Sequence, residues 1–113
     1  MSQDGLELLP GTLDLLILKA VSAAPRHGYA IAQWVRGVSE GEFLVEEGSL
    51  YPALQRNRGK GWLEARWGVS DTGRRVRFYE ITPAGRARLE AQLRIWGRYA
   101  RAVERAMAAD PAR

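Results

Sequence analysis

The chain has 113 residues, of which 46% are hydrophobic and 27% charged, a balance typical of one globular domain. It holds no cysteine and a single histidine, which excludes a disulfide framework, a thiolate metal site, a zinc hydrolase and a cysteine protease. We therefore expect no metal, no cofactor and no catalytic residues, and we do not expect an enzyme.

The basic residues gather in the middle of the chain. Residues 1–47 carry a net charge of −4 and residues 48–77 a net charge of +5. Arginine outnumbers lysine 15 to 2, and guanidinium groups suit phosphates and guanine edges. This distribution is typical of a phosphate-binding surface, although a basic surface that is exposed only for solubility gives the same pattern.

The N-terminal residues do not resemble a secretion signal. Asp4 and Glu7 lie where such a signal carries basic residues. The most apolar stretch, residues 13–24, is interrupted by Asp14 and Lys19 and is too short to cross a bilayer. The sequence therefore predicts a cytoplasmic protein with no membrane partner.

Two short helices are expected in the first third of the chain. Thr12 can cap the first helix through its hydroxyl, and apolar side chains then recur at helical spacing as far as the stop at Pro25. Apolar residues between Tyr29 and Val35 mark the second helix, which is expected to end around Gly37.

A third helix is expected from about Ser49, a residue type that favours the N-cap, with Pro52 tolerated in its first turn. Asn57 and Gly59 are poor residues for a helix interior, and glycine costs about 1 kcal/mol relative to alanine there. We therefore expect this helix to end early, near Arg58, or to pack loosely.

A hairpin and a long helix complete the chain. Residues 62–69 and 76–81 are rich in aromatic and β-branched residues, and the intervening turn carries arginines. Thr82 and Pro83 predict the start of a helix that runs to about Ala109. Its apolar residues have coiled-coil spacing, which predicts a dimer interface made of Leu89, Leu93, Trp96, Ala100, Val103 and Met107.

This order of elements predicts a mainly α fold with a small β-hairpin, a winged helix-turn-helix. Residues 9–81 would form the DNA-binding domain and residues 82–109 the dimerisation helix, packed as one structural unit. The third helix would enter the major groove, and the hairpin would lie along the backbone or in the minor groove. Six cations of these two elements are expected to converge on one surface: Arg56, Arg58, Lys60, Arg74, Arg75 and Arg77.

Five motifs follow one another along the chain: LPGTLDLLIL from residue 9, HGYAI from residue 27, EGSLYPAL from residue 47, GRR from residue 73 and YEITPAG from residue 79. In these motifs the chain resembles the PadR family of transcriptional regulators, over residues 8–107. The resemblance implies a winged-helix domain, a C-terminal dimerisation helix and repression of a nearby operator, often relieved by a small molecule.

The resemblance also implies individual DNA contacts. These are made near the backbone, at the start of the recognition helix and at the wing tip, by Tyr29, Ser49, Tyr51, Pro52, Arg74 and Arg75. Tyr51 fits a core position with a wet hydroxyl equally well. We expect His27 to be a structural or capping residue, and Trp62 and Trp67 to pack within the hairpin.

Trp96 is the candidate effector residue. A tryptophan is awkward in a tight two-helix interface, where leucine packs better. In drug-responsive family members a tryptophan at this place lines a pore at the dimer centre and stacks on planar aromatic compounds. The resemblance implies the same for Trp96, with walls formed by Leu93, Ala100, Leu13 and Leu16. Plain dimer packing of Trp96 is the open alternative.

The sequence thus predicts a homodimer that binds double-stranded DNA, with recognition helices about 34 Å apart. The alternative is a dimeric protein-interaction module whose basic hairpin contacts an acidic partner, without specific DNA binding. Salt-dependent, sequence-selective binding to a duplex distinguishes the two.

Overall fold

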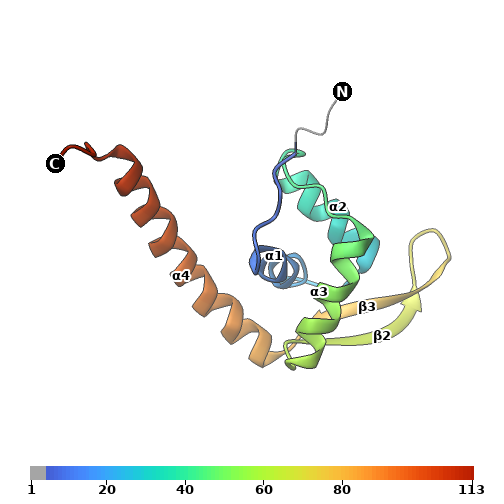
Figure 1. The fold of residues 1–113 in the computed structure, drawn as a ribbon. Helices are drawn as coiled ribbons and strands as arrows, with labels where there is room; N and C mark the ends of the chain where they lie inside the picture. The colour runs from blue at the N-terminus through green and yellow to red at the C-terminus, as the bar shows by residue number, and fades with distance from the viewer. Residues whose placement is uncertain (1–4) are drawn as a thin grey trace.

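The computed structural model describes residues 5–113, so Asp4 lies outside the described residues. The expected order of three helices, a hairpin and a long helix is confirmed (Figure 1). The elements are α1 Thr12–Ala20, β1 Arg26–His27, α2 Gly28–Val38, α3 Glu47–Gly59, β2 Leu63–Val69, β3 Arg75–Ile81 and α4 Pro83–Ala108. Four helices and a small antiparallel sheet make this a winged-helix fold.

Helix α1 is shorter than the sequence predicted. Its N-cap is Gly11, with φ of 85° and no side-chain cap, and Thr12 is already helical, so the predicted Thr12 cap is wrong. The helix ends at Ala20, whose carbonyl accepts a hydrogen bond from Arg26 Nε at 2.7 Å. The helix thus ends before Pro25, and the Arg26 side chain satisfies one of its terminal carbonyls.

The sheet has the strand order β1-β3-β2, and all its pairs are antiparallel. Strands β2 and β3 are the predicted hairpin. The two-residue strand β1 was not predicted, because two residues show no alternation of polar and apolar side chains. At its end His27 caps α2, accepting a hydrogen bond at Nδ1 from the Ala30 amide at 3.3 Å, so the expected capping role is confirmed.

Helix α3 starts earlier than expected. Its N-cap is Glu46, so the predicted Ser49 cap is wrong and Pro52 lies beyond the first turn. Pro52 has no N–H to donate to the carbonyl of Gly48, four residues earlier. Both residues are exposed, so that carbonyl can bond to water.

Helix α3 finishes at Gly59, one residue after Arg58, so the expected end near Arg58 is confirmed. Asn57, the residue that predicted an early end, is fully buried in the core. Its Nδ2 donates a hydrogen bond to the Ala53 carbonyl of the same helix at 3.0 Å. The alternative expectation of loose packing is wrong at Asn57, because this residue is packed into the core.

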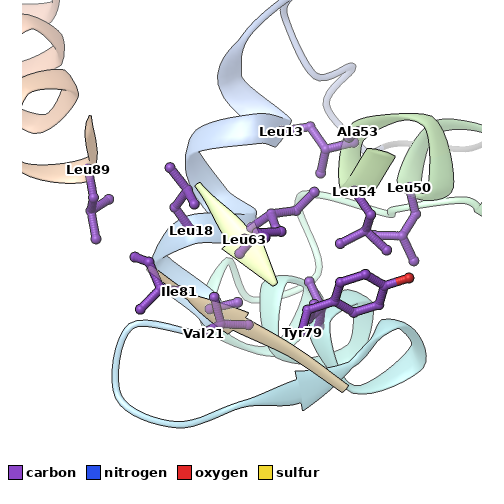
Figure 2. Packing of buried hydrophobic residues seen from close by; sticks show 13 residues of the cluster. Leu13, Leu18, Val21, Leu50, Ala53, Leu54, Leu63, Tyr79, Ile81 and Leu89 are labelled. Atoms are coloured by element: carbon purple, nitrogen blue, oxygen red, sulfur yellow. The ribbon is translucent and has the colours of Figure 1, made fainter. Parts of the chain in front are cut away.

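One hydrophobic core joins all four helices to the sheet. In Figure 2 its side chains converge from α1, α3, the strands and α4. Burying each large apolar side chain contributes about 1.5–3 kcal/mol. The buried cluster consists of Leu13, Ile17, Leu18, Ala20, Val21, Ile31, Leu50, Ala53, Leu54, Leu63, Tyr79, Ile81 and Leu89.

Helix α4 begins as predicted. Thr82 Oγ1 accepts a hydrogen bond from the Gly85 amide at 2.9 Å and donates one to the Gly61 carbonyl at 2.6 Å. A Cβ atom at Gly85 would collide with the Trp62 carbonyl oxygen, so only glycine permits this close approach. Beyond Leu89 the helix projects away from the rest of the chain (Figure 1).

The division expected at residue 82 stays a prediction. In the structure β3 ends at Ile81 and α4 begins at Pro83. Within residues 5–113, no helix has the length and apolar character needed to cross a membrane.

Candidate nucleic-acid interface

The outer side of α3 is nearly bare. The helix buries a stripe that contains Leu50, Leu54 and Asn57. At 3.6 residues per turn, the opposite side is an exposed ridge made of Gly48, Pro52, Gln55 and Gly59. A Cβ atom added at either glycine would meet nothing within 4 Å. Gln55 is the one long side chain of the ridge, and at the two glycines the backbone of α3 can approach the floor of a groove closely.

The arginines of α3 lie on its flanks. Arg56 and Arg58 are two positions apart, which places them about 200° apart around the helix. Arg56 binds Asp14 of α1 through two hydrogen bonds, from Nη2 to Oδ1 at 2.8 Å and from Nε to Oδ2 at 3.2 Å. The hydrogen bond to Asp14 and the negative charge of Asp14 raise the pKa of Arg56. Arg58 instead donates to Gln55 Oε1 at 3.2 Å.

Lys60 shares the side of Arg56. Its ammonium nitrogen lies 5.5 Å from the Trp62 ring centroid, and the Arg88 guanidinium carbon lies 4.6 Å from the same centroid. Residues of α1 and α4 line a cleft together with Arg56, Lys60 and Trp62. The expected convergence of six cations on one surface is therefore wrong for Arg56 and Lys60, because contacts with α1, Trp62 and α4 draw them aside.

Arg58 lies on the side of the hairpin. It lines a second cleft between α3 and β2, together with Gln55, Gly59, Leu63, Glu64 and Ala65. Strand β2 packs directly against α3. This is the side of α3 on which the wing can add further cations.

The hairpin of β2 and β3 forms a projecting wing (Figure 1). Its tip is closed by hydrogen bonds from the Ser70 amide to the Arg74 carbonyl at 2.8 Å and from the Gly73 amide to the Ser70 carbonyl at 2.9 Å. Gly73 has φ of 82°, a left-handed conformation that favours glycine. The predicted tip residue Arg74 is exposed at this turn.

The two faces of the wing differ in charge. One face of the hairpin covers the core at its base, where Leu63 and Tyr79 are buried. Further toward the tip, the same face carries Trp67, Arg75 and Arg77. On the other face Arg66 is paired with Glu80 at 2.6 Å. Unpaired cations are therefore found on the face that continues toward α3.

Two tyrosines flank this region. The Tyr51 side chain lies over Gly28, where a Cβ atom would be 3.0 Å from the Tyr51 hydroxyl oxygen. Tyr51 is 45% exposed, so the core interpretation of this residue is wrong. Partial burial, followed by the charge of Glu47, raises the pKa of Tyr51. Tyr29 is exposed on α2, and its hydroxyl accepts a hydrogen bond from Gln33 Nε2 at 2.6 Å.

The predicted interface residues of α4 lie in two environments. Leu89 is only 6% exposed and belongs to the core of its own chain. Ala100 is half-buried, while the other four, Leu93, Trp96, Val103 and Met107, are exposed. Two exposed apolar residues of the same helix, Ile95 and Tyr99, were missed because they fall outside the heptad spacing.

Trp96 is 46% exposed and stacks on Tyr99, with ring centroids 6.1 Å apart and an angle of 24° between the planes. Of the effector walls expected on the first helix, Leu16 is half-buried. Leu13 is buried in the core, so its assignment as a wall is wrong. Among residues 5–113 there is no group of three or more side chains suited to bind a metal ion.

Known proteins resemble this chain over most of its length. A family model described as the transcriptional regulator PadR-like family matches residues 17–91. An uncharacterized protein of Lysinibacillus sphaericus is 35% identical over 91 residues, which cover 80% of this chain and 83% of that protein.

Solved structures agree with this match. A PadR family transcription regulator from Clostridium difficile is 30% identical, with a TM-score of 0.72, over 88% of this chain and 100% of that one. A PadR-like transcriptional regulator from Bacillus cereus is 28% identical, with a TM-score of 0.75, over 88% and 95% of the two chains. The chain therefore belongs to the PadR-like family, whose members are transcriptional regulators and not enzymes.

Proposed function

We propose that this protein is a homodimeric repressor that binds a specific double-stranded DNA operator. The observation that carries the proposal is the bare ridge of α3 beside a wing with unpaired cations. The ridge enters the major groove, and the arginines bind the phosphates that border it. Four cations per protomer serve this role: Arg58, Arg74, Arg75 and Arg77.

Within this proposal, Arg56 is a structural link between α3 and α1 and not a DNA contact. Its guanidinium already uses two donors on Asp14. Ser49 and Pro52, both exposed on α3, and Tyr51 and Tyr29 remain proposed contacts. The protonated hydroxyl of Tyr51 suits a phosphate oxygen.

The dimer forms through the exposed apolar side chains of α4. From Leu93 to Met107 these side chains extend along about 21 Å of helix, at 1.5 Å per residue. A contiguous apolar surface of this kind marks an interaction site. A second copy of α4 offers the same heptad spacing, and a two-fold axis then brings two α3 helices onto successive turns of the operator.

The effector in this proposal is a planar aromatic compound that stacks on Trp96. The support is the exposed ring of Trp96, which already has a stacked neighbour in Tyr99. Leu93 and Ala100 flank it on the same helix, and Leu16 is the remaining candidate wall on α1. A ligand held between two α4 helices changes the separation of the two α3 helices and thereby weakens operator binding.

Binding to the DNA upstream of its own gene, measured at several salt concentrations with competitor DNA present, tests the proposal. We plot the logarithm of the binding constant against the logarithm of the salt concentration. With three or four phosphates neutralised per protomer, the slope of this plot for the dimer is expected to be roughly −5 to −7. Replacing Arg74 and Arg75 together by alanine should flatten the slope by about 3–4 and leave the dimer intact.

A matched control replaces two exposed arginines of α4, Arg98 and Arg101, by alanine, and should leave the slope unchanged. A slope near zero, or equal affinity for unrelated DNA, would support the protein-interaction module instead. An unchanged slope in the Arg74 and Arg75 double variant would contradict the assignment of the wing.

A further inference from the structure

We infer that Trp67 is a positioning residue of the wing, whose indole ring holds Arg75 and Arg77 in the orientation that binds DNA phosphates. The inference rests on the proposed DNA-binding function and adds a residue to it. Trp67 lies on β2, which is an edge strand of the sheet, and both arginines lie on the central strand β3.

The strand register brings these three side chains together. Trp67 pairs directly with Arg77, and Arg75 pairs with Val69, two residues further along β2. Side chains two apart on a strand share a face, so all three lie on the same face of the wing. The guanidinium carbons of Arg75 and Arg77 lie 4.5 and 5.3 Å from the centroid of the Trp67 ring.

Trp67 does not belong to the hydrophobic core. It is 55% exposed and is absent from the buried cluster and from the residues packed against that cluster. An exposed indole offers its electron-rich face to cations, and tryptophan is the strongest cation–π partner among the side chains. The contacts that account for its place on the wing are those with the two arginines.

The indole ring is also what fixes Arg77. The Nε atom of Arg77 is buried and has no hydrogen-bond partner among residues 5–113. No hydrogen bond from Nε therefore orients this side chain, and the contact that its guanidinium does make is with the Trp67 ring. Arg66, on the opposite face, is oriented by its ion pair with Glu80, which also neutralises its charge.

Stacking on an indole leaves a guanidinium free to bind phosphate. When a guanidinium stacks on an aromatic ring, the contact uses its flat face, whereas its N–H donors point outward in the plane. An arginine that is already ordered loses less side-chain freedom when it binds. Trp67 thus raises affinity without adding a charge of its own.

The test measures affinity and salt slope for the upstream duplex with Trp67→Ala, Trp67→Leu and Trp67→Phe. Because the cations remain, we expect the Ala and Leu variants to bind about tenfold more weakly with a nearly unchanged slope. Trp67→Phe keeps an aromatic face and should restore most of the affinity. Arg75→Ala, in contrast, should flatten the slope by about 2 for the dimer.

Coupling separates positioning from direct contact. In a background with Arg75→Ala and Arg77→Ala, replacing Trp67 by alanine should have little further effect on DNA affinity. A full tenfold loss in that background would mean that Trp67 contacts DNA itself, and would overturn the inference. Equal affinity of Trp67→Leu and the parent protein would overturn it as well, while leaving the proposed function standing.

A measurement without DNA completes the test. The ring current of the indole should shift the side-chain proton resonances of Arg75 and Arg77 upfield, and Trp67→Leu should remove that shift. Shifts that are already absent in the parent protein would contradict the positioning role whatever the DNA affinities are. If the parent protein shows these shifts but binds no duplex, it is the proposed function that fails.

Discussion

The body of the protein, residues 5–92, and the distal part of α4, residues 93–108, differ in what covers the regularly spaced apolar side chains of their helices. In the body, Leu18, Ile31 and Leu54 are almost completely buried. In the distal part, Leu93, Trp96 and Val103 are exposed, although their spacing is as regular as that of any buried stripe. One protomer thus completes one core and leaves apolar side chains exposed on the distal part of α4.

Leu89 marks the boundary between the two regions. Its spacing belongs to the α4 heptads, while its side chain packs into the core with α1 and the strands (Figure 2). A heptad pattern identifies which side of a helix is apolar but not which neighbour covers it. Leu89 is covered by its own chain, whereas Leu93, about one turn later, is exposed.

The largest expected effect comes from cutting α4 on either side of that boundary. A chain that ends after Ala87 loses Leu89 and leaves α1 uncovered, so it should unfold or aggregate. A chain that ends after Gln92 keeps Leu89 and should remain a folded monomer. Sedimentation and circular dichroism of the two chains measure this difference, and a well-folded monomer ending at Ala87 would contradict the assignment of Leu89 to the core.

Single substitutions sharpen the same comparison. Leu54→Ala should lower the free energy of unfolding by about 2–5 kcal/mol at every protein concentration, because it opens a cavity in the core. Val103→Ala should act through the dimer, so that its effect on the melting temperature depends on protein concentration. If Val103→Ala lowered the melting temperature equally at every protein concentration, Val103 would instead make its contacts within one chain.

The sequence predicted element order well, because each signal was local. Apolar spacing located the helices, and Thr82 with Pro83 located the start of α4. The turn residues placed Arg74 at the tip of the wing. Helix ends were predicted less well, since their terminal groups can bond to residues beyond the helix, as the Ala20 carbonyl of α1 does to Arg26.

The candidate site was predicted only in part, because its side chains are directed by distant partners. Arg56 turns toward Asp14, which is 42 residues away in the chain. The bare ridge of α3 did leave a signal, since Gly48, Pro52 and Gly59 recur at helical spacing. It was missed because the helix was expected to begin at about Ser49, one residue after Gly48.

Trp96 tests what covers the distal part of α4. If its ring lines a ligand site, Trp96→Ala should abolish the binding of flat aromatic compounds and weaken the dimer little. If it only packs in the dimer, no such compound binds the parent protein, and the variant weakens the dimer by about 3–5 kcal/mol per buried tryptophan. Fluorescence quenching must be compared with the variant, because Trp34, Trp62 and Trp67 also emit.

The smallest expected effects come from one exposed arginine in each region. Arg56→Gln removes a two-bond ion pair between α1 and α3, and because the pair is partly exposed the loss should stay within about 1 kcal/mol. Arg98→Gln removes an exposed arginine that forms no hydrogen bond or ion pair within residues 5–113, so stability should change by less than about 0.5 kcal/mol.

Urea unfolding of both variants, at one high and one low protein concentration, checks this pair. A loss for Arg98→Gln that appears only at the concentration where the protein is dimeric would mean that a carboxylate of the second copy lies opposite Arg98. The dimer interface on α4 would then include polar as well as apolar side chains, and the second copy would contact the helix on two sides. If Arg98→Gln lowered stability at both concentrations, Arg98 would make a contact within its own chain. That result would contradict the separation of the distal part of α4 from the body.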